Sequence, residues 1–159
     1  MDDVKTDYAA QGQAILMENY RRFIDPKYSV RQVLVEHQHF NDPEKLAHLQ
    51  GLFFRAAEQN AIPIVNYNDP VSFTENRKME LSVLKQKHDD VVECIDNDET
   101  AAVIAEAVHA RTLLLMTGVD GIYANPDDPS TLIRSITAKT PEHLIAKVRE
   151  MQSHCVGAS

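Results

Sequence analysis

The chain has 159 residues, 43% hydrophobic and 25% charged, with 16 Lys and Arg against 24 Asp and Glu for a formal net charge of −8. This size and composition fit one globular domain with its own core and exclude a disordered chain. The acidic balance argues against a nucleic-acid partner, because phosphate contacts need clustered cations. No apolar run approaches the roughly 20 residues that cross a bilayer, so we expect no membrane partner.

The cysteine content indicates the cellular compartment. Cys94 and Cys155 are the two cysteines, and the sequence opens on Met1, Asp2 and Asp3 rather than on a basic and apolar leader. A framework of disulfides needs more cysteines and an oxidising compartment. These features predict a reducing, cytoplasmic setting.

The first predicted elements are a helix, a strand and a second helix. Apolar residues recur at helical spacing over residues 8–23, although Gly12 weakens that helix by about 1 kcal/mol relative to alanine. Residues 30–35 are short and rich in β-branched side chains, which predicts a strand. The next helix begins after Asn41 and Asp42, where a capping side chain and a proline precede apolar residues three and four apart.

Strands and helices then continue to alternate. The apolar run at residues 62–66 is too short for a helix and ends in a polar cluster before Pro70, so it predicts a buried strand. Residues 75–87 are charged with a weak apolar stripe, which is compatible with a surface helix or a mobile insertion and favours the helix. Residues 91–95 are predicted to form another strand.

The last third of the sequence has the same character. An alanine-rich helix is expected over residues 99–110, after a capping cluster of Asn and Asp. Residues 112–116 are uniformly apolar, as in a central strand that is covered on both faces. A short strand is expected at 132–136, and a final helix begins at Pro141.

Alternation of strands and helices predicts an α/β fold, a three-layer sandwich with a mainly parallel sheet, in a single domain over residues 1–159. Ligands of such sheets gather beyond the carboxyl ends of the strands. That rule selects three loops as candidate sites, at residues 66–69, 96–98 and 117–123.

The first two loops are rich in carboxylates and amides. Such side chains can hold an ammonium group, a hydroxyl or a hydrated Mg²⁺. The same residue types are favoured in loops and at helix starts, and capping alone explains Asp98. Spacing alone leaves both interpretations open for the remaining members, which are Asn66, Asn68, Asp69, Asp96 and Asn97.

The third loop and the histidines carry weaker signals. The glycines of residues 117–123 permit close approach of a nucleotide base, and Tyr123 offers an aromatic face, although an ordinary turn has the same composition. His37 and His39 have a spacing that can ligate zinc, but no third ligand accompanies them, which favours a surface pair. The sequence contains no GxSxG, Walker-type or GxGxxG motif.

In their order along the chain these segments resemble the amino acid kinase superfamily, and within it the glutamate 5-kinases. The resemblance covers about residues 9–136. The motifs that carry it are PIVNYND before Pro70, the DND of residues 96–98 and LLLMTGVDGIY, which ends at Tyr123. Shorter matches lie at residues 11–13 and 40–42.

The resemblance implies a reaction and the residues that bind its acceptor. Family members of this kind transfer the γ-phosphoryl group of ATP to the side-chain carboxylate of glutamate, in proline biosynthesis. By match, Asp69, Asn97 and Asn68 would contact glutamate, with Asp69 suited to its α-ammonium group. Asp98 would be the catalytic residue that orients the phosphate-binding lysines.

The resemblance also implies a nucleotide site and a metal cofactor. Thr117 and Gly118 would line the ATP site, with Tyr123 near the base. Mg²⁺ would neutralise part of the charge that develops during phosphoryl transfer, which depends mainly on positioning and electrostatics.

The sequence departs from the family at both ends and at two places within. Members open with a strand bearing a lysine and a glycine-rich turn, and later carry a second glycine-rich segment with another lysine. Neither is found here, so we expect a central portion, truncated at both ends, that works as a fragment, a homo-oligomer or with a complementing chain. Tyr67 replaces an acid, and residues 72–93 are longer than their counterpart.

Two alternative functions remain open from the sequence. One is a catalytically inactive binding or regulatory module of the same fold, and the other is a uridylate (nucleoside-monophosphate) kinase relative. A trimmed sheet would leave an apolar edge uncovered, so we also expect self-association through that edge.

Overall fold

The computed structural model describes residues 2–71, 74–87, 91–94, 96–125 and 127–155. The chain divides into two compact units, Met1–Leu113 and Leu114–Ser159. The single domain expected over the whole sequence stays a prediction.

The first unit is built on a parallel pair of strands, β1 (Ser29–Val35) and β2 (Ala61–Tyr67). Both predicted strands in this region are confirmed, and their register places Val35 opposite Tyr67. Parallel strands need a crossover, which α2 (His37–Asn41) and α3 (Pro43–Glu58) provide. The carboxyl ends of both strands therefore open at the same edge.

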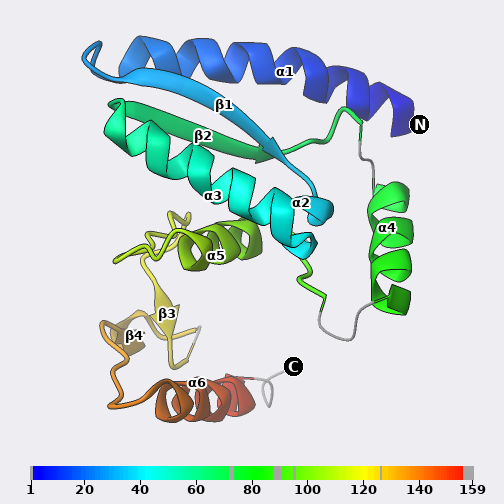
Figure 1. Ribbon diagram of the computed structural model, residues 1–159. Coiled ribbons are helices and arrows are strands. Elements are labelled where there is room, and N and C mark those ends of the chain that lie inside the picture. Colours follow the sequence, from blue (N-terminus) through cyan, green and yellow to red (C-terminus); the bar gives the residue numbers. More distant parts are fainter. Residues whose placement is uncertain (1, 72–73, 88–90, 95, 126, 156–159) are drawn as a thin grey trace. The chain divides into compact units, whose positions relative to one another are not determined.

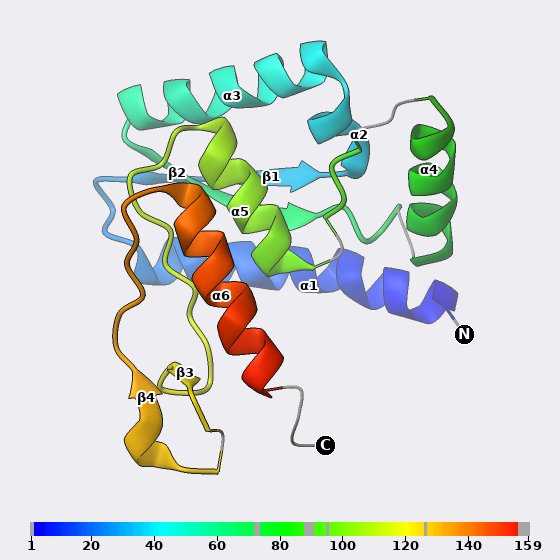
Figure 2. The same ribbon diagram turned by 90° about the horizontal axis from the view of Figure 1, so that it is seen from below.

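Helices cover both faces of this strand pair. Helix α1 (Asp2–Phe23) is longer than predicted and packs along β1 on one face, while α3 covers the other face (Figures 1 and 2). Helix α5 (Asn97–Ala107) lies on the same side as α3 (Figure 1). The layers confirm the predicted α/β fold with a parallel sheet.

The core of this unit lies between β1 and the helices α3 and α5. Burial of each large apolar side chain contributes about 1.5–3 kcal/mol, so a small cluster suffices to fix the layers. Val103 and Ile104 of α5 pack against that cluster. The cluster consists of Val33, Val35, Phe40, Leu49 and Cys94.

Helix boundaries follow the capping residues of the sequence. Asp42 is the N-cap of α3, and its side chain accepts hydrogen bonds from the backbone N–H groups of Glu44 and Lys45 at 2.9 and 3.1 Å. Pro43 follows at the first helical position, where its missing N–H costs nothing. The charged insertion forms α4 (Thr74–Lys87), as predicted.

Two predicted strands are wrong. Residues 91–94 run without a β partner in the described chain, and residue 95 lies outside the described residues. Residues 112–116 form no strand either, and Leu114 and Met116 are 78% and 93% exposed. Apolar composition favours a strand only where a neighbouring backbone completes its hydrogen bonds, and neither segment pairs with a strand among the described residues.

The second unit is small. Strands β3 (Ile122–Tyr123) and β4 (Leu132–Ile133) pair antiparallel, with the 3₁₀ turn η1 (Pro129–Thr131) between them, and α6 (Pro141–Cys155) follows. The strand predicted at 132–136 is thus shorter than expected, whereas the last helix begins at the predicted proline.

Among the helices described, none has the length and hydropathy needed to span a membrane.

Candidate substrate site

A polar cleft of about 370 Å³ opens where β2 ends. One wall follows the carboxyl end of β2, and the other belongs to the segment that leads into α5 and to the first turn of that helix. The residues that line it are Asn66, Tyr67, Asp69, Cys94, Asp96, Asn97 and Thr100.

The β2 wall is anchored by Tyr67 and by continued backbone pairing. The Tyr67 side chain is buried, and its hydroxyl accepts a hydrogen bond from the His37 backbone N–H at 3.3 Å. The rings of Tyr67 and His37 pack edge to face with their centroids 5.4 Å apart. One residue later, the Asn68 N–H donates to the Val35 carbonyl at 3.0 Å. These contacts hold the chain up to Asn68, and the half-buried Asp69 follows in a turn.

The opposite wall is fixed by the start of α5. Asp96 is the N-cap, and its carboxylate accepts a hydrogen bond from the Glu99 N–H at 2.8 Å. The buried Thr100 donates from its hydroxyl to the Asp96 carbonyl at 2.8 Å. Thr100 was not among the predicted site residues, although its position three residues after Asn97, on the same helical face, was a usable signal.

The structure brings together two of the three predicted glutamate-binding residues and places the third, Asn68, and the predicted catalytic residue Asp98 elsewhere. Asp69 and Asn97 line the same cleft from opposite walls. Asn68 does not line it, because its side-chain amide donates to Glu36 Oε1 at 2.6 Å. Asp98 is exposed in the first turn of α5, outside the lining.

Directly after β1, Glu36 gathers several polar groups. Burial of this carboxyl disfavours its ionised form, but hydrogen bonds from Asn68 and Gln38 and the nearby charges of His39 and Lys45 outweigh burial and lower its pKa. Glu36 is therefore an anion at neutral pH that holds the loop after β2.

The α4 residue Glu80 has the opposite shift. Burial and the neighbouring carboxylate of Glu36 raise its pKa, and these effects outweigh a hydrogen bond with the Gln38 backbone and the positive charges nearby. The two carboxyls thus carry opposite pKa shifts.

The predicted nucleotide-binding residues all lie in the second unit. Thr117 Oγ1 accepts from the Val119 N–H at 3.0 Å and closes a short turn. A Cβ at Gly118 would meet no atom within 4 Å, so packing does not require glycine there. Tyr123 is half-buried in β3, and its hydroxyl donates to Asp120 Oδ2 at 3.5 Å.

The two histidines that were considered as metal ligands have different surroundings. His37 is buried, which corrects the predicted surface pair, and His39 Nδ1 accepts from the Glu36 backbone N–H at 2.9 Å. Within the described ranges no group of three His, Cys, Asp or Glu side chains could hold a metal ion. Kinases commonly bind Mg²⁺ through nucleotide phosphates and one or two carboxylates, so these residues fit only an ion that arrives with the nucleotide.

Curated relatives of this chain are glutamate 5-kinases. The chain is 30% identical over 143 residues to that of Shouchella clausii, 29% over 146 residues to that of Alkaliphilus metalliredigens, and 31% over 137 residues to that of Bacteroides thetaiotaomicron. These matches cover 88%, 91% and 84% of this chain, but 34%, 49% and 34% of the relatives. The chain therefore spans between a third and a half of their length.

Whereas no solved structure gives a significant match, a family model extends the same relationship over nearly the whole sequence. The model of the amino acid kinase family matches residues 3–153, which include both walls of the cleft and the loop with Thr117 and Tyr123. The α/β layers, the cleft at the carboxyl end of β2 and this match lead to one conclusion: the chain belongs to the amino acid kinase family.

Proposed function

We propose that this chain supplies the acceptor site of a glutamate 5-kinase-like enzyme, in which ATP phosphorylates the side-chain carboxylate of glutamate. The observation that carries the proposal is the meeting of Asp69 and Asn97 in one cleft. The relatives named as glutamate 5-kinases support this choice of acceptor.

The charges of the cleft favour an amino acid. Asp69 and Asp96 contribute carboxylates, and no described residue that lines the cleft is basic. A carboxylate attracts an ammonium group, so Asp69 is proposed to hold the α-ammonium of glutamate. Asp96 differs from Asp69 in its role, because its carboxylate accepts the Glu99 N–H as the N-cap of α5.

The start of α5 is proposed to receive a carboxylate of the ligand. The first N–H groups of a helix have no intrahelical partner and carry a partial positive charge. Asn97 is the first residue of α5 and the neutral side chain among the acids Asp96, Asp98 and Glu99. Its amide can donate to a carboxylate, whereas the three acids repel one.

The remaining assignments follow the family. Thr117, Gly118 and Tyr123 are proposed to contact ATP, Asp98 to orient cationic groups on the phosphates, and Asn68 to support the glutamate wall through Glu36. Phosphoryl transfer requires positioning and neutralisation of charge, and Mg²⁺ bound with ATP supplies part of that neutralisation. The proposed location is the cytoplasm, in a homo-oligomer or with a complementing chain.

Calorimetric titration with glutamate and glutarate tests the acceptor site. Glutarate has both carboxylates of glutamate but no amino group. Asp69→Asn keeps the shape of the side chain and removes its charge, so it should weaken glutamate binding at least tenfold and leave glutarate binding within twofold. The control is Asp7→Asn on the exposed face of α1, which should change neither affinity.

Phosphoryl transfer is measured separately, as ADP formed from ATP in the presence of glutamate or uridine monophosphate. Turnover with glutamate supports the proposed activity, and turnover with uridine monophosphate supports the nucleoside-monophosphate kinase instead. Glutamate binding without turnover identifies a binding module. Equal glutamate affinity in the wild type and Asp69→Asn would overturn the site assignment.

A further inference from the structure

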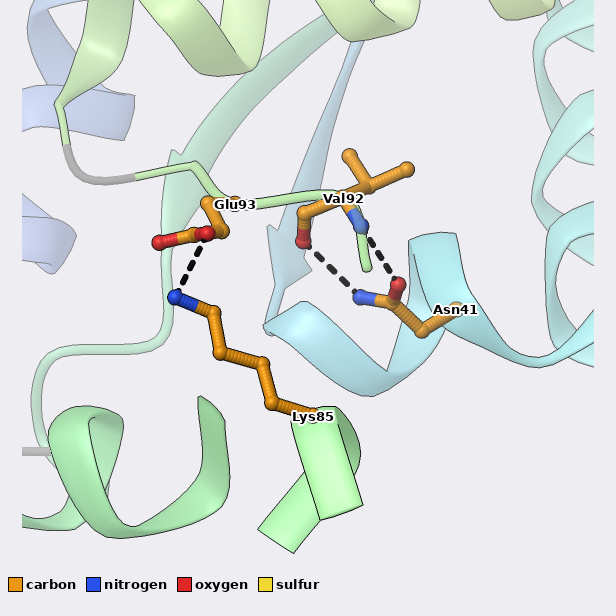
Figure 3. Close-up of polar contacts among 4 residues, drawn as sticks. All are labelled: Asn41, Lys85, Val92 and Glu93. Carbon is orange, nitrogen blue, oxygen red and sulfur yellow. Dashed lines mark hydrogen bonds and ion pairs between the residues drawn. The ribbon is translucent and has the colours of Figure 1, made fainter. Parts of the chain in front are cut away.

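The side chain of Asn41 joins the end of α2 to the segment that leads into the cleft. Its Oδ1 accepts a hydrogen bond from the Val92 N–H at 2.8 Å, and its Nδ2 donates to the Val92 carbonyl at 3.0 Å (Figure 3). The same Nδ2 donates to the His37 carbonyl at 2.9 Å. One half-buried amide thus ties Val92 to α2.

This pair of bonds reproduces what a neighbouring strand would provide. Residues 91–94 have no β partner within the described chain, so their backbone groups need other partners. A carboxamide presents a donor and an acceptor side by side, whereas an aspartate only accepts. Asn41 is therefore a side-chain substitute for a strand at Val92.

The position of Val92 affects the cleft, because the residues that follow it in the chain line one wall. Cys94, two residues later, is 1% exposed, lines the cleft and packs in the core cluster with Phe40 of α2. Asp96 and Asn97 follow and form the second wall. A shift at Val92 would therefore move the wall that carries Asn97.

A second tether to the same segment is weaker. Lys85 of α4 forms an ion pair with Glu93 at 2.7 Å, and the two side chains are 52% and 39% exposed (Figure 3). Exposed ion pairs contribute little because water and salt screen them and long side chains lose entropy. Two hydrogen bonds to a partly buried backbone are costlier to break, so Asn41 is the dominant tether.

We infer that Asn41 is a positioning residue of the cleft, which holds residues 91–94 where Asn97 faces Asp69. Its consequence for glutamate rests on the proposed function. The position of the segment itself can be measured without any ligand, so the two ideas can fail separately.

Amide exchange, followed residue by residue by NMR, tests the positioning role without ligand. Asn41→Ala should accelerate exchange of the Val92 amide at least tenfold and leave the β2 amides unchanged, which shows that the sheet is intact. Asn41→Asp keeps the acceptor for the Val92 N–H but loses the donor to the Val92 carbonyl, so exchange of that amide should rise less than in Asn41→Ala. If Asn41→Ala does not fold, Asn41→Asp decides through the accessibility of Cys94.

The matched control is Asn19→Ala. Asn19 donates from Nδ2 to the Ile15 carbonyl at 3.1 Å, the same bond to the fourth preceding residue that Asn41 makes to His37, but on the exposed face of α1. In a Cys155→Ser background, Asn41→Ala and Asn41→Asp should speed the reaction of Cys94 with a thiol reagent at least tenfold and fivefold, and Asn19→Ala should not.

A double-mutant cycle with Asn97→Ala separates positioning from general stability. Asn41→Ala should weaken glutamate binding at least tenfold alone, yet change it less than twofold when Asn97 is already alanine, because it acts through that side chain. A purely structural role would weaken binding equally in both backgrounds and would overturn the inference. Unchanged Val92 exchange in Asn41→Ala, or unchanged Cys94 reactivity in both Asn41 variants, would overturn it as well.

A wild type that binds no glutamate would also give a clear result. The proposed function then fails, while the exchange and thiol rates still decide whether Asn41 holds the wall of the cleft. Glutamate binding with unaltered exchange rates in the variants has the opposite meaning: the acceptor site stands and the positioning role falls.

Discussion

Asn68 donates a hydrogen bond from its side-chain amide to Glu36 Oε1 at 2.6 Å, and so joins the residues that directly follow the carboxyl ends of β2 and β1. The Asn68 backbone N–H still bonds to the Val35 carbonyl, and the side-chain bond to Glu36 adds a second link between the two strand ends. The loop that carries Asp69 begins at this bond.

Removal of that bond should loosen the loop. We expect Asn68→Ala to lower the free energy of unfolding by about 1 kcal/mol, because the acceptor is ionised but partly exposed to water. Urea unfolding at pH 7 measures the change, with Asn19→Ala as the control. A loss no larger than that of the control would contradict this role.

The lowered pKa of Glu36 gives this bond a pH dependence. A carboxyl whose pKa is lower in the folded state contributes stability above its ordinary value of 4.5, and the contribution is lost as the pH falls through the folded pKa. The stability difference between the wild type and Glu36→Gln should therefore shrink below pH 4.5. Urea unfolding of both proteins between pH 3 and pH 7 measures this change. The difference between their midpoints should vary on the order of tenths of a molar unit.

Glu80 should behave in the opposite way. Its pKa is raised, mainly by burial and then by the Glu36 carboxylate, so the protonated form is favoured in the folded state. The corresponding stability is present below pH 4.5 and is lost as the pH rises through the folded pKa. Glu80→Gln should thus be more stable than the wild type at pH 7 and no more stable at pH 4, as thermal melts at both values would show. Equal melting temperatures at pH 7 would contradict the shift.

The core between β1 and α3 should be sensitive to cavities. Leu49 is 6% exposed and belongs to the cluster with Val33 and Val35. Leu49→Ala should cost about 2–4 kcal/mol of unfolding free energy, from lost burial and from the cavity left behind. Chemical denaturation measures it, and Leu144→Ala on α6, whose side chain is 38% exposed, should cost less than half as much.

Gly121 should not tolerate a side chain. Its φ of +151° is a conformation that favours glycine, and an added Cβ would lie 3.1 Å from Leu132 Cδ1 across the β3–β4 pair. Gly121→Ala should therefore destabilise the second unit by about 1–2 kcal/mol. Gly118→Ala has open space and is the control. Equal melting curves for the two variants would contradict this prediction.

Local signals in the sequence predicted the elements whose hydrogen bonds are local. Capping residues located the start of α3 at Pro43 and the start of α6 at Pro141, and the apolar runs located β1 and β2. The segments at 91–94 and 112–116 have the same composition as strands but lack a neighbour in the described chain. Strand formation depends on a partner that composition does not encode.

The candidate site was predictable to a similar degree. The rule about carboxyl ends of strands selected Asp69 and Asn97, and both line the cleft. The rule could not foresee that Asn68 turns toward Glu36, because adjacent residues at a strand end point in different directions. The contact between Asn41 and Val92 has no sequence signal, since it joins a helix end to a distant segment through one side chain.

The two walls of the cleft differ in how they are attached. The wall after β2 continues a hydrogen-bonded strand pair, whereas the wall before α5 is tied to the described fold by the Asn41 amide, by Lys85 and by packing of Cys94. Attachments of this kind open at a lower free energy than a strand pair. A ligand that contacts both walls stabilises the arrangement in which they lie close together. At a concentration one hundred times its dissociation constant, it stabilises that arrangement by about 2.7 kcal/mol.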